Sequence, residues 1–63
     1  MMIYGYRGTI DWSKVRNAFK KHTELTATEI ETHVKTIKSG GTVNIPADFV
    51  LFDDLKELGL FVK

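Results

Sequence analysis

The sequence predicts a small α+β domain with the element order β-α-α-β-α-β, in which three helices pack on one face of a small antiparallel three-stranded sheet. Three observations support this fold. Two amphipathic segments follow one another within residues 15–34, short alternating segments lie near both ends of the chain, and a glycine follows each of the last two expected helices. At 63 residues, without a repeat or a linker, the chain is expected to form a single domain, residues 1–63.

The first segment, residues 2–7, alternates in the way typical of a strand. One face is expected to carry Met2, Tyr4 and Tyr6, and the other Ile3, Gly5 and Arg7. Gly5 marks a position where another backbone or side chain is expected to come close. Gly8 and Thr9 then turn the chain into the first helix.

The first helix is expected to begin at Asp11, whose side chain caps it while Ile10 packs onto Val15. Its buried face is expected to consist of Val15, Ala18, Phe19 and His22. Lys20 and Lys21 lie near its C-terminal end, where cations complement the helix dipole.

The second helix has the clearest start signal, because Thr26 and Glu29 match the capping box, in which each side chain binds a backbone N–H of the other residue. Leu25 and Ile30 add a hydrophobic staple. The apolar face is expected to consist of Ala27, Ile30, Val34 and Ile37. Gly40 ends the helix, and the link of residues 23–25 is so short that the two helices form an αα-hairpin.

The third helix is predicted from an ambiguous segment. Residues 49–52 form an apolar run that fits either a buried strand or a helix. The spacing that favours a helix is that of Phe52, Leu55 and Leu58. We therefore predict a helix that begins near Ala47 or Asp48 and ends at Gly59.

Two more strands complete the expected sheet. Residues 42–45 alternate as a short strand that Pro46 ends, and residues 60–63 form the last strand. We expect the last strand to lie in the interior of the sheet, because a terminal strand must be tied down to be ordered. The predicted shared core consists of Phe19, Ile30, Val34, Val43, Leu55 and Val62.

Composition and motifs exclude several classes of function. The absence of cysteine removes zinc ribbons and thiol nucleophiles and fits a reducing compartment. No signal peptide and no apolar run of membrane-spanning length stand out, so we expect a cytoplasmic protein without membrane contact. No phosphate-binding or catalytic motif is present, and Glu29 and His33 supply only two ligands of the three or more that a metal needs. We expect neither an enzyme nor a cofactor or metal site.

The charges are polarised along the chain, although the net charge is only +1. Residues 1–24 carry five Lys or Arg and two acidic residues, whereas residues 25–63 carry four and six. Arg16, Lys20 and Lys21 decorate the first helix, so that this helix can attract an acidic partner, although a merely solvated helix face has the same composition. Trp12 in its first turn is either an exposed binding anchor or a cap on the edge of the core.

Several residues resemble the C-terminal domain of the bacterial ribosomal large-subunit stalk protein. Those in register with its helical hairpin are Val15, Ala18, Phe19, Lys20, Thr23, Leu25, Glu29 and Val34. Those in register with its remainder are Lys38-Ser39-Gly40, residues 55–59 and Val62-Lys63. The resemblance implies the α+β fold predicted above and a free-standing version of this domain, such as the short stalk-like proteins of phages, because the stalk protein's dimerisation segment and hinge have no counterpart here.

The resemblance also implies a partner surface, since the family presents its first helix and the start of the second to translational GTPases. The corresponding positions here are Trp12, Ser13, Arg16, Asn17, Lys20 and Glu31. Asn17 replaces a cation of the family and Glu31 reverses one, and the glycines of the family's interhelical turn are missing. The partner is therefore expected to be a protein other than a translational GTPase.

From the sequence we favour a non-enzymatic protein-binding module, an adaptor or inhibitor that is phage-encoded and acts on a host protein. Its expected partner-binding residues are Trp12, Arg16, Asn17, Lys20 and Lys21. The alternative is an RNA- or DNA-contacting, translation-associated module, whose cations would be Arg7, Lys14, Arg16, Lys20 and Lys21. The low net charge speaks against this alternative, because nucleic-acid-binding domains usually carry a strongly basic surface.

Overall fold

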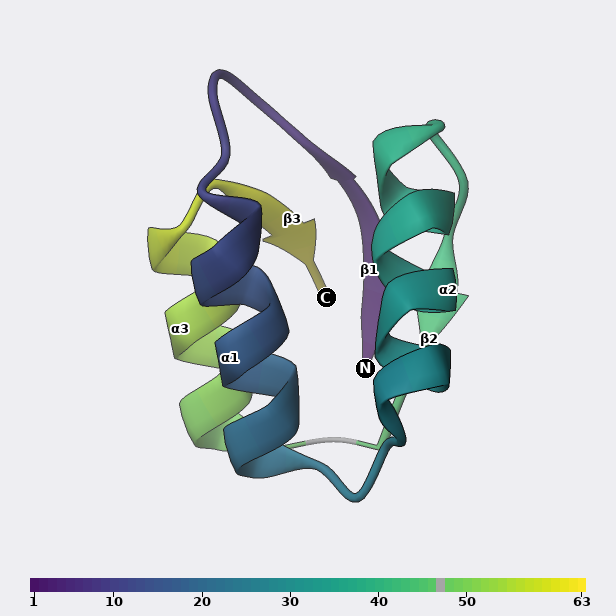
Figure 1. Ribbon diagram of the computed structural model, residues 1–63. Helices are drawn as coiled ribbons and strands as arrows, with labels where there is room; N and C mark the ends of the chain where they lie inside the picture. Colours follow the sequence, from purple (N-terminus) through teal and green to yellow (C-terminus); the bar gives the residue numbers. More distant parts are fainter. Residues whose placement is uncertain (47) are drawn as a thin grey trace.

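The computed structural model describes residues 1–46 and 48–63, and within them the chain forms three helices and one three-stranded antiparallel sheet (Figure 1). The elements are β1 (Met2–Tyr6), α1 (Trp12–His22), α2 (Ala27–Lys38), β2 (Val43–Asn44), α3 (Phe49–Glu57) and β3 (Leu60–Val62). The predicted α+β class and element order are confirmed. The segment 49–52 is helical, while the predicted helix start at Ala47 lies outside the described residues.

The helices begin at the predicted capping residues. The Asp11 carboxylate accepts the Lys14 N–H at 3.3 Å, and the Asp48 carboxylate accepts the Leu51 N–H at 2.8 Å. At α2 the capping box is complete: the Glu29 N–H donates to the Thr26 hydroxyl at 3.1 Å, and the Thr26 N–H donates to Glu29 Oε1 at 3.0 Å. Side chains within four residues of each other therefore fix where each helix begins.

The helices end in two different ways. After α2, Gly40 adopts φ +89°, and the N–H groups of Gly40 and Gly41 return to the carbonyls of Ile37 and Thr36, as in a Schellman motif. After α1 there is no glycine. Instead the Thr23 N–H and hydroxyl both donate to the Phe19 carbonyl, so a threonine closes this helix in an extended conformation.

The strand order is β2-β1-β3, so the N-terminal strand is central and the C-terminal strand lies at an edge. The expectation of an interior C-terminal strand is wrong. Met2 and Lys63 exchange two backbone hydrogen bonds of 2.8 and 2.9 Å, and Leu60 and Val62 are buried. Pairing with β1 on one side, together with burial of alternate side chains, is enough to order β3 at the edge of the sheet.

A β-bulge in β1 changes the predicted alternation. Ile3 pairs with Val62 and Gly5 with Phe61, so an extra residue of β1 lies between the pairs. The bulge turns Tyr6 to the helix side, where its ring contacts Trp12 at 5.2 Å between ring centroids. The expectation that Tyr4 and Tyr6 share one face is therefore wrong. The close approach expected at Gly5 is confirmed: a Cβ there would lie 3.1 Å from the Phe61 ring.

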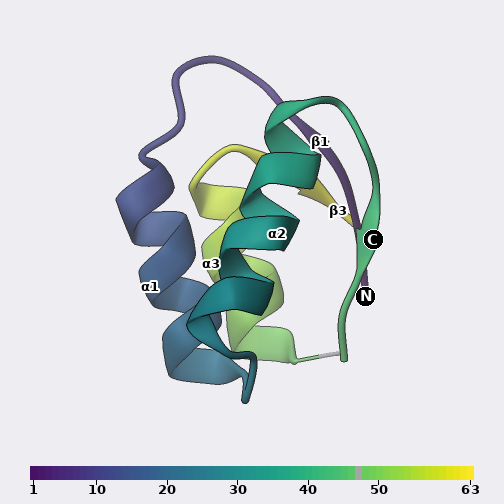
Figure 2. The same ribbon diagram turned by 45° about the vertical axis from the view of Figure 1, so that its right-hand side comes forward.

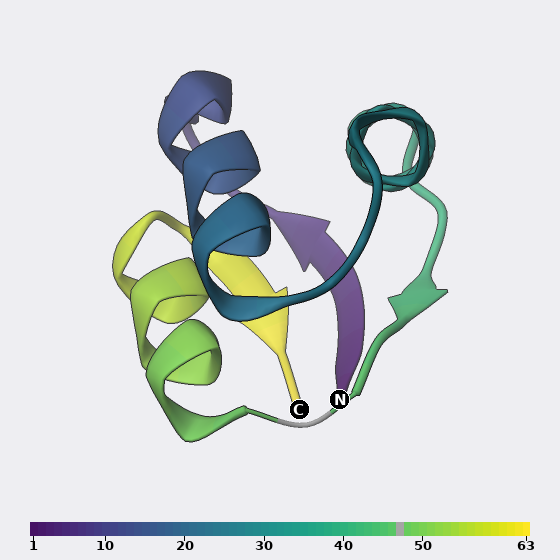
Figure 3. The same cartoon turned by 60° about the horizontal axis from the view of Figure 1, so that its bottom comes forward.

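The helices α1, α2 and α3 lie on the same face of the sheet (Figure 2). Of these, α2 and α3 rest directly on the strands, and α1 packs on the other two helices. The two ends of the chain lie side by side, next to the start of β1 and the end of β3 (Figure 3).

All six residues of the predicted core are buried. They are joined by Ile3, Ile10, Val15, Ala18, Ile37, Ile45, Leu51 and Leu60. Ala27 is exposed, against expectation, because the first position of α2 faces α1 across a groove and not the sheet. His22 is mostly buried at the other side of α1, with Nε2 3.2 Å from the Asp54 carboxylate of α3.

Candidate partner-binding groove

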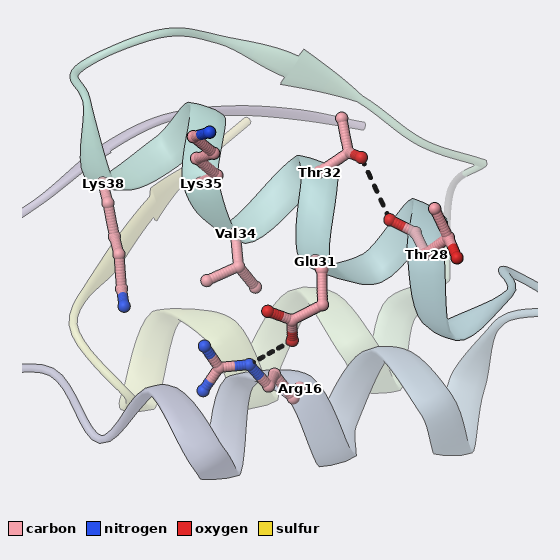
Figure 4. A pocket seen from close by; sticks show the side chains of 7 residues that line it. All are labelled: Arg16, Thr28, Glu31, Thr32, Val34, Lys35 and Lys38. Carbon is pink, nitrogen blue, oxygen red and sulfur yellow. Dashed lines mark hydrogen bonds and ion pairs between the residues drawn. The ribbon is translucent and has the colours of Figure 1, made fainter.

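Two adjoining hollows, which share Arg16 of α1 and Glu31 of α2, lie along these helices, and we call them together the interhelix groove. Its first stretch, of about 380 Å³, is lined by Arg16, Thr28, Glu31, Thr32, Val34, Lys35 and Lys38 (Figure 4). Its second stretch, of about 230 Å³, is lined by Arg16, Asn17, Lys20, Leu25, Ala27, Ile30 and Glu31. Arg16 of α1 and Glu31 of α2 belong to both stretches. This pair of charges therefore lies where the two stretches join.

Arg16 and Glu31 form an ion pair across the groove, with 2.5 Å between Nε and Oε1 (Figure 4). Both side chains keep contact with solvent, at 35% and 59% exposure. The pair uses Nε of the guanidinium, which has further N–H donors at its two terminal nitrogens. Glu31 thus neutralises part of the charge of Arg16 and leaves other donors of the same side chain available.

Lys38, which lines the first stretch, contacts the aromatic side chain of Trp12. Figure 4 shows Lys38 extending from α2 toward α1, and its Nζ lies 5.2 Å from the centre of the Trp12 ring. Trp12 is half-buried against the core and packs edge-on against Tyr6. Trp12 therefore covers the edge of the core as one of the two interpretations has it, while its role in binding stays a prediction.

The structure brings Arg16, Asn17 and Lys20 to the groove, whereas Trp12 lines neither stretch and contacts the groove residue Lys38. Lys21 is exposed and lines neither stretch. Sequence reasoning missed Lys35 and Lys38, which come from α2. The signal was present, because Glu31, Lys35 and Lys38 recur at the i, i+4, i+7 spacing of one helical face.

The cations of the nucleic-acid alternative do not share one surface. Lys14 lies on the side of α1 that faces α3, in a hollow that Asp54 and Glu57 of α3 also line. Its charge is thus offset by carboxylates on the far side of α1 from the groove. Arg16 and Lys20 alone remain from that set in the interhelix groove.

The carboxylate suggested by a metal-like spacing has a structural role. Glu29 accepts the Thr26 N–H, and the backbone amide and then the hydroxyl of Thr26 lower the pKa of Glu29. Within residues 1–46 and 48–63, no three His, Cys, Asp or Glu side chains gather as metal ligands would. No helix in the same residues is long and apolar enough to cross a membrane.

No protein family, curated protein or solved structure matches the chain in comparisons with known proteins. The chemistry of the interhelix groove therefore has to be inferred from the described residues that line it. Among these, the cations are Arg16, Lys20, Lys35 and Lys38, and the single carboxylate is Glu31. Between the charges lie methyl groups of Val34, Leu25 and Ile30, so the groove has apolar parts as well as charged walls.

Proposed function

We propose that the chain is a non-enzymatic protein-binding module whose interhelix groove holds an acidic segment of a partner protein. The observation that supports this most directly is the lining of the groove, where the described residues supply four cations against one carboxylate. Charge complementarity of this kind steers an acidic partner to the groove and sets its orientation there.

A protein partner fits the groove better than a nucleic acid does. The groove combines its cations with apolar side chains from both helices, such as Leu25 and Val34, and protein interfaces use such a mixture of apolar core and charged rim. A nucleic acid needs a stripe of cations that follows the phosphate backbone, whereas here Lys14 is separated from the groove and faces carboxylates.

The resemblance to the ribosomal stalk domain supports the same location, because that family also presents its first helix to partners. Under this proposal the domain is an adaptor or inhibitor encoded by a phage and acting on a protein of its host. The absence of cysteine is consistent with action in the cytoplasm.

The test is a pull-down from bacterial cytosol with the immobilised chain, with and without nuclease treatment. We expect a protein to be captured in both conditions, and we expect Arg16→Gln with Lys20→Gln to abolish its capture. Neutral replacements are preferable to charge reversal, because a carboxylate at position 16 would face Glu31. Capture that disappears with nuclease treatment would favour the nucleic-acid alternative.

The matched control is Lys14→Gln with Lys56→Gln. It removes the same amount of charge from exposed lysines outside the interhelix groove. Capture should survive in this variant. If both double variants lose capture equally, net charge and not the groove is responsible, and the proposed location is wrong.

A further inference from the structure

The first turn of α3 exposes side chains that the fold does not use. Phe49 is 92% exposed and Val50 is 56% exposed, although they directly follow the cap of the helix. By contrast Phe19 on α1 is completely buried. An aromatic side chain that a well-capped helix keeps exposed to solvent is the kind of residue that anchors protein interfaces.

A hollow lies beside this aromatic side chain. It has a volume of about 300 Å³ and is lined by Met1, Asp48, Phe49, Phe52 and Lys63. Phe52 is partly buried and, with Met1, packs against the core, so the hollow has a fixed apolar floor. A protruding phenyl ring and an apolar hollow that can take one thus belong to the same small patch, which we call the Phe49 patch.

We propose that the Phe49 patch is a self-association interface, in which Phe49 of each copy enters the hollow of the other across a two-fold axis. An isologous interface requires a patch that is complementary to itself. The Phe49 patch meets this requirement because it contains both the protruding ring and the hollow.

The charges at the patch also fit a second copy. The charged side chains that line the hollow are those of Asp48, a carboxylate, and Lys63, an ammonium group. The cap uses Oδ1 of Asp48, so the other carboxylate oxygen can accept a bond from outside the helix. A two-fold arrangement pairs each Asp48 with the other copy's Lys63, and the net charge of +1 produces little repulsion between copies.

The available area is consistent with a weak dimer. Stable interfaces bury on the order of 1,000 Å² or more in total, and one buried phenylalanine contributes about 150–250 Å². Two copies of Phe49, each with a partner hollow, supply a central part of that area and leave a charged rim. The interface is separate from the interhelix groove, so it can form whether or not the groove binds a partner.

The test is sedimentation of the whole chain from about 10 µM to about 1 mM, the range in which a weak dimer forms. We expect the mass to rise from 7.2 kDa toward twice that value with concentration. Phe49→Ser should weaken association at least about tenfold, while Val50→Ser, in the same turn but outside the hollow, should retain it. Lys63→Glu should also weaken association, more at low salt than at high salt, since it places like charges opposite Asp48.

Circular dichroism of Phe49→Ser should show an unchanged fold, because the side chain is exposed. In NMR spectra, rising concentration should shift the amides of residues 48–52 and leave those around Arg16 and Lys38 unchanged. A wild-type chain that stays monomeric throughout the concentration range overturns the proposal. So does a dimer that persists in Phe49→Ser, or one whose amide shifts map to the interhelix groove.

Discussion

The first turns of α2 and α3 begin with similar caps and differ in the side chains that come after the cap. At α2, Thr26 and Glu29 bind each other's backbone, and the exposed side chains of the helix apart from Ala27 are polar or charged. At α3, Asp48 caps the helix alone, and Phe49 and Val50 extend into solvent. The comparison shows that a cap fixes where a helix begins and has no influence on which side chains meet water. In the first turn of α3, folding accounts for the buried Leu51 but not for the exposed Phe49 and Val50.

The largest expected effect sharpens this contrast with one substitution at two positions. Phe19→Ala should lower the free energy of unfolding by roughly 3 to 5 kcal/mol, enough to unfold a domain of this size, because Phe19 is fully buried. Phe49→Ala should change it little, because exposed side chains contribute little to stability. Urea unfolding followed by circular dichroism measures both. A folded Phe19→Ala protein would contradict the core described above.

A smaller effect is expected at the cap of α2. Thr26→Ala removes the hydroxyl that accepts the Glu29 N–H and should cost about 1 kcal/mol. For a domain of this size that corresponds to a lower melting temperature by roughly 4–8 °C. Thr28→Ala, an exposed threonine two residues further on, is the control and should melt within about 1–2 °C of the wild type. Equal melting of all three proteins would show that the hydroxyl of Thr26 does not stabilise α2.

The ion pair across the interhelix groove should contribute still less. Glu31→Gln removes the partner of Arg16, and the two partly exposed side chains are expected to stabilise the fold by about 0.2–1 kcal/mol. A double-mutant cycle with Arg16→Gln isolates this coupling, which should shrink as salt is added. A coupling that exceeds this range and resists salt would mean that the pair is a structural link between α1 and α2.

The smallest effect is expected in acid and concerns the reciprocal cap that α3 lacks. Hydrogen bonds from Thr26 lower the pKa of Glu29 in the folded state. Its contribution is therefore complete above the pKa of the unfolded chain, about 4.3, and is lost as the pH falls through the folded pKa. Glu29→Gln should flatten the decline of the melting temperature in this acid range, and Glu57→Gln, in the last turn of α3, should not. Identical acid profiles for the two variants would rule out this role of Glu29.

The helices could be predicted from the sequence because their signals are local. Thr26 and Glu29 stand three residues apart, and Gly40 directly follows the cap residue Ser39. Strand order has no such signal. β1 pairs with segments about 40 and 60 residues away, and the edge position of β3 depends on how the whole chain packs. The bulge beside Tyr4 likewise depends on pairing with Phe61 and is invisible to a two-residue alternation.

The residues of the candidate site could likewise be predicted only where their signal lies within one helix. The cations of α1 were found from their place on the outer face of one helix, and Arg16, Asn17 and Lys20 do lie together. The contribution of α2 was missed because Arg16 and Glu31, fifteen residues apart, meet only once the hairpin has packed. The exposure of Phe49 was also missed, because an apolar run is read as core unless the direction of the helix is known.

The central place of β1 has a consequence for synthesis. It is made before its neighbours, which are β2, beginning at Val43, and β3, beginning at Leu60. α1 and α2 can pair early, whereas one edge of β1 stays unpaired until β2 has been made, and the other edge stays unpaired until β3 has been made. Because distant pairings form slowly and open strand edges promote aggregation, we expect the sheet to close only once β3 has left the ribosome. Until then, the amphipathic helical hairpin is the nascent structure best placed to shield the tyrosine-rich first strand from other chains.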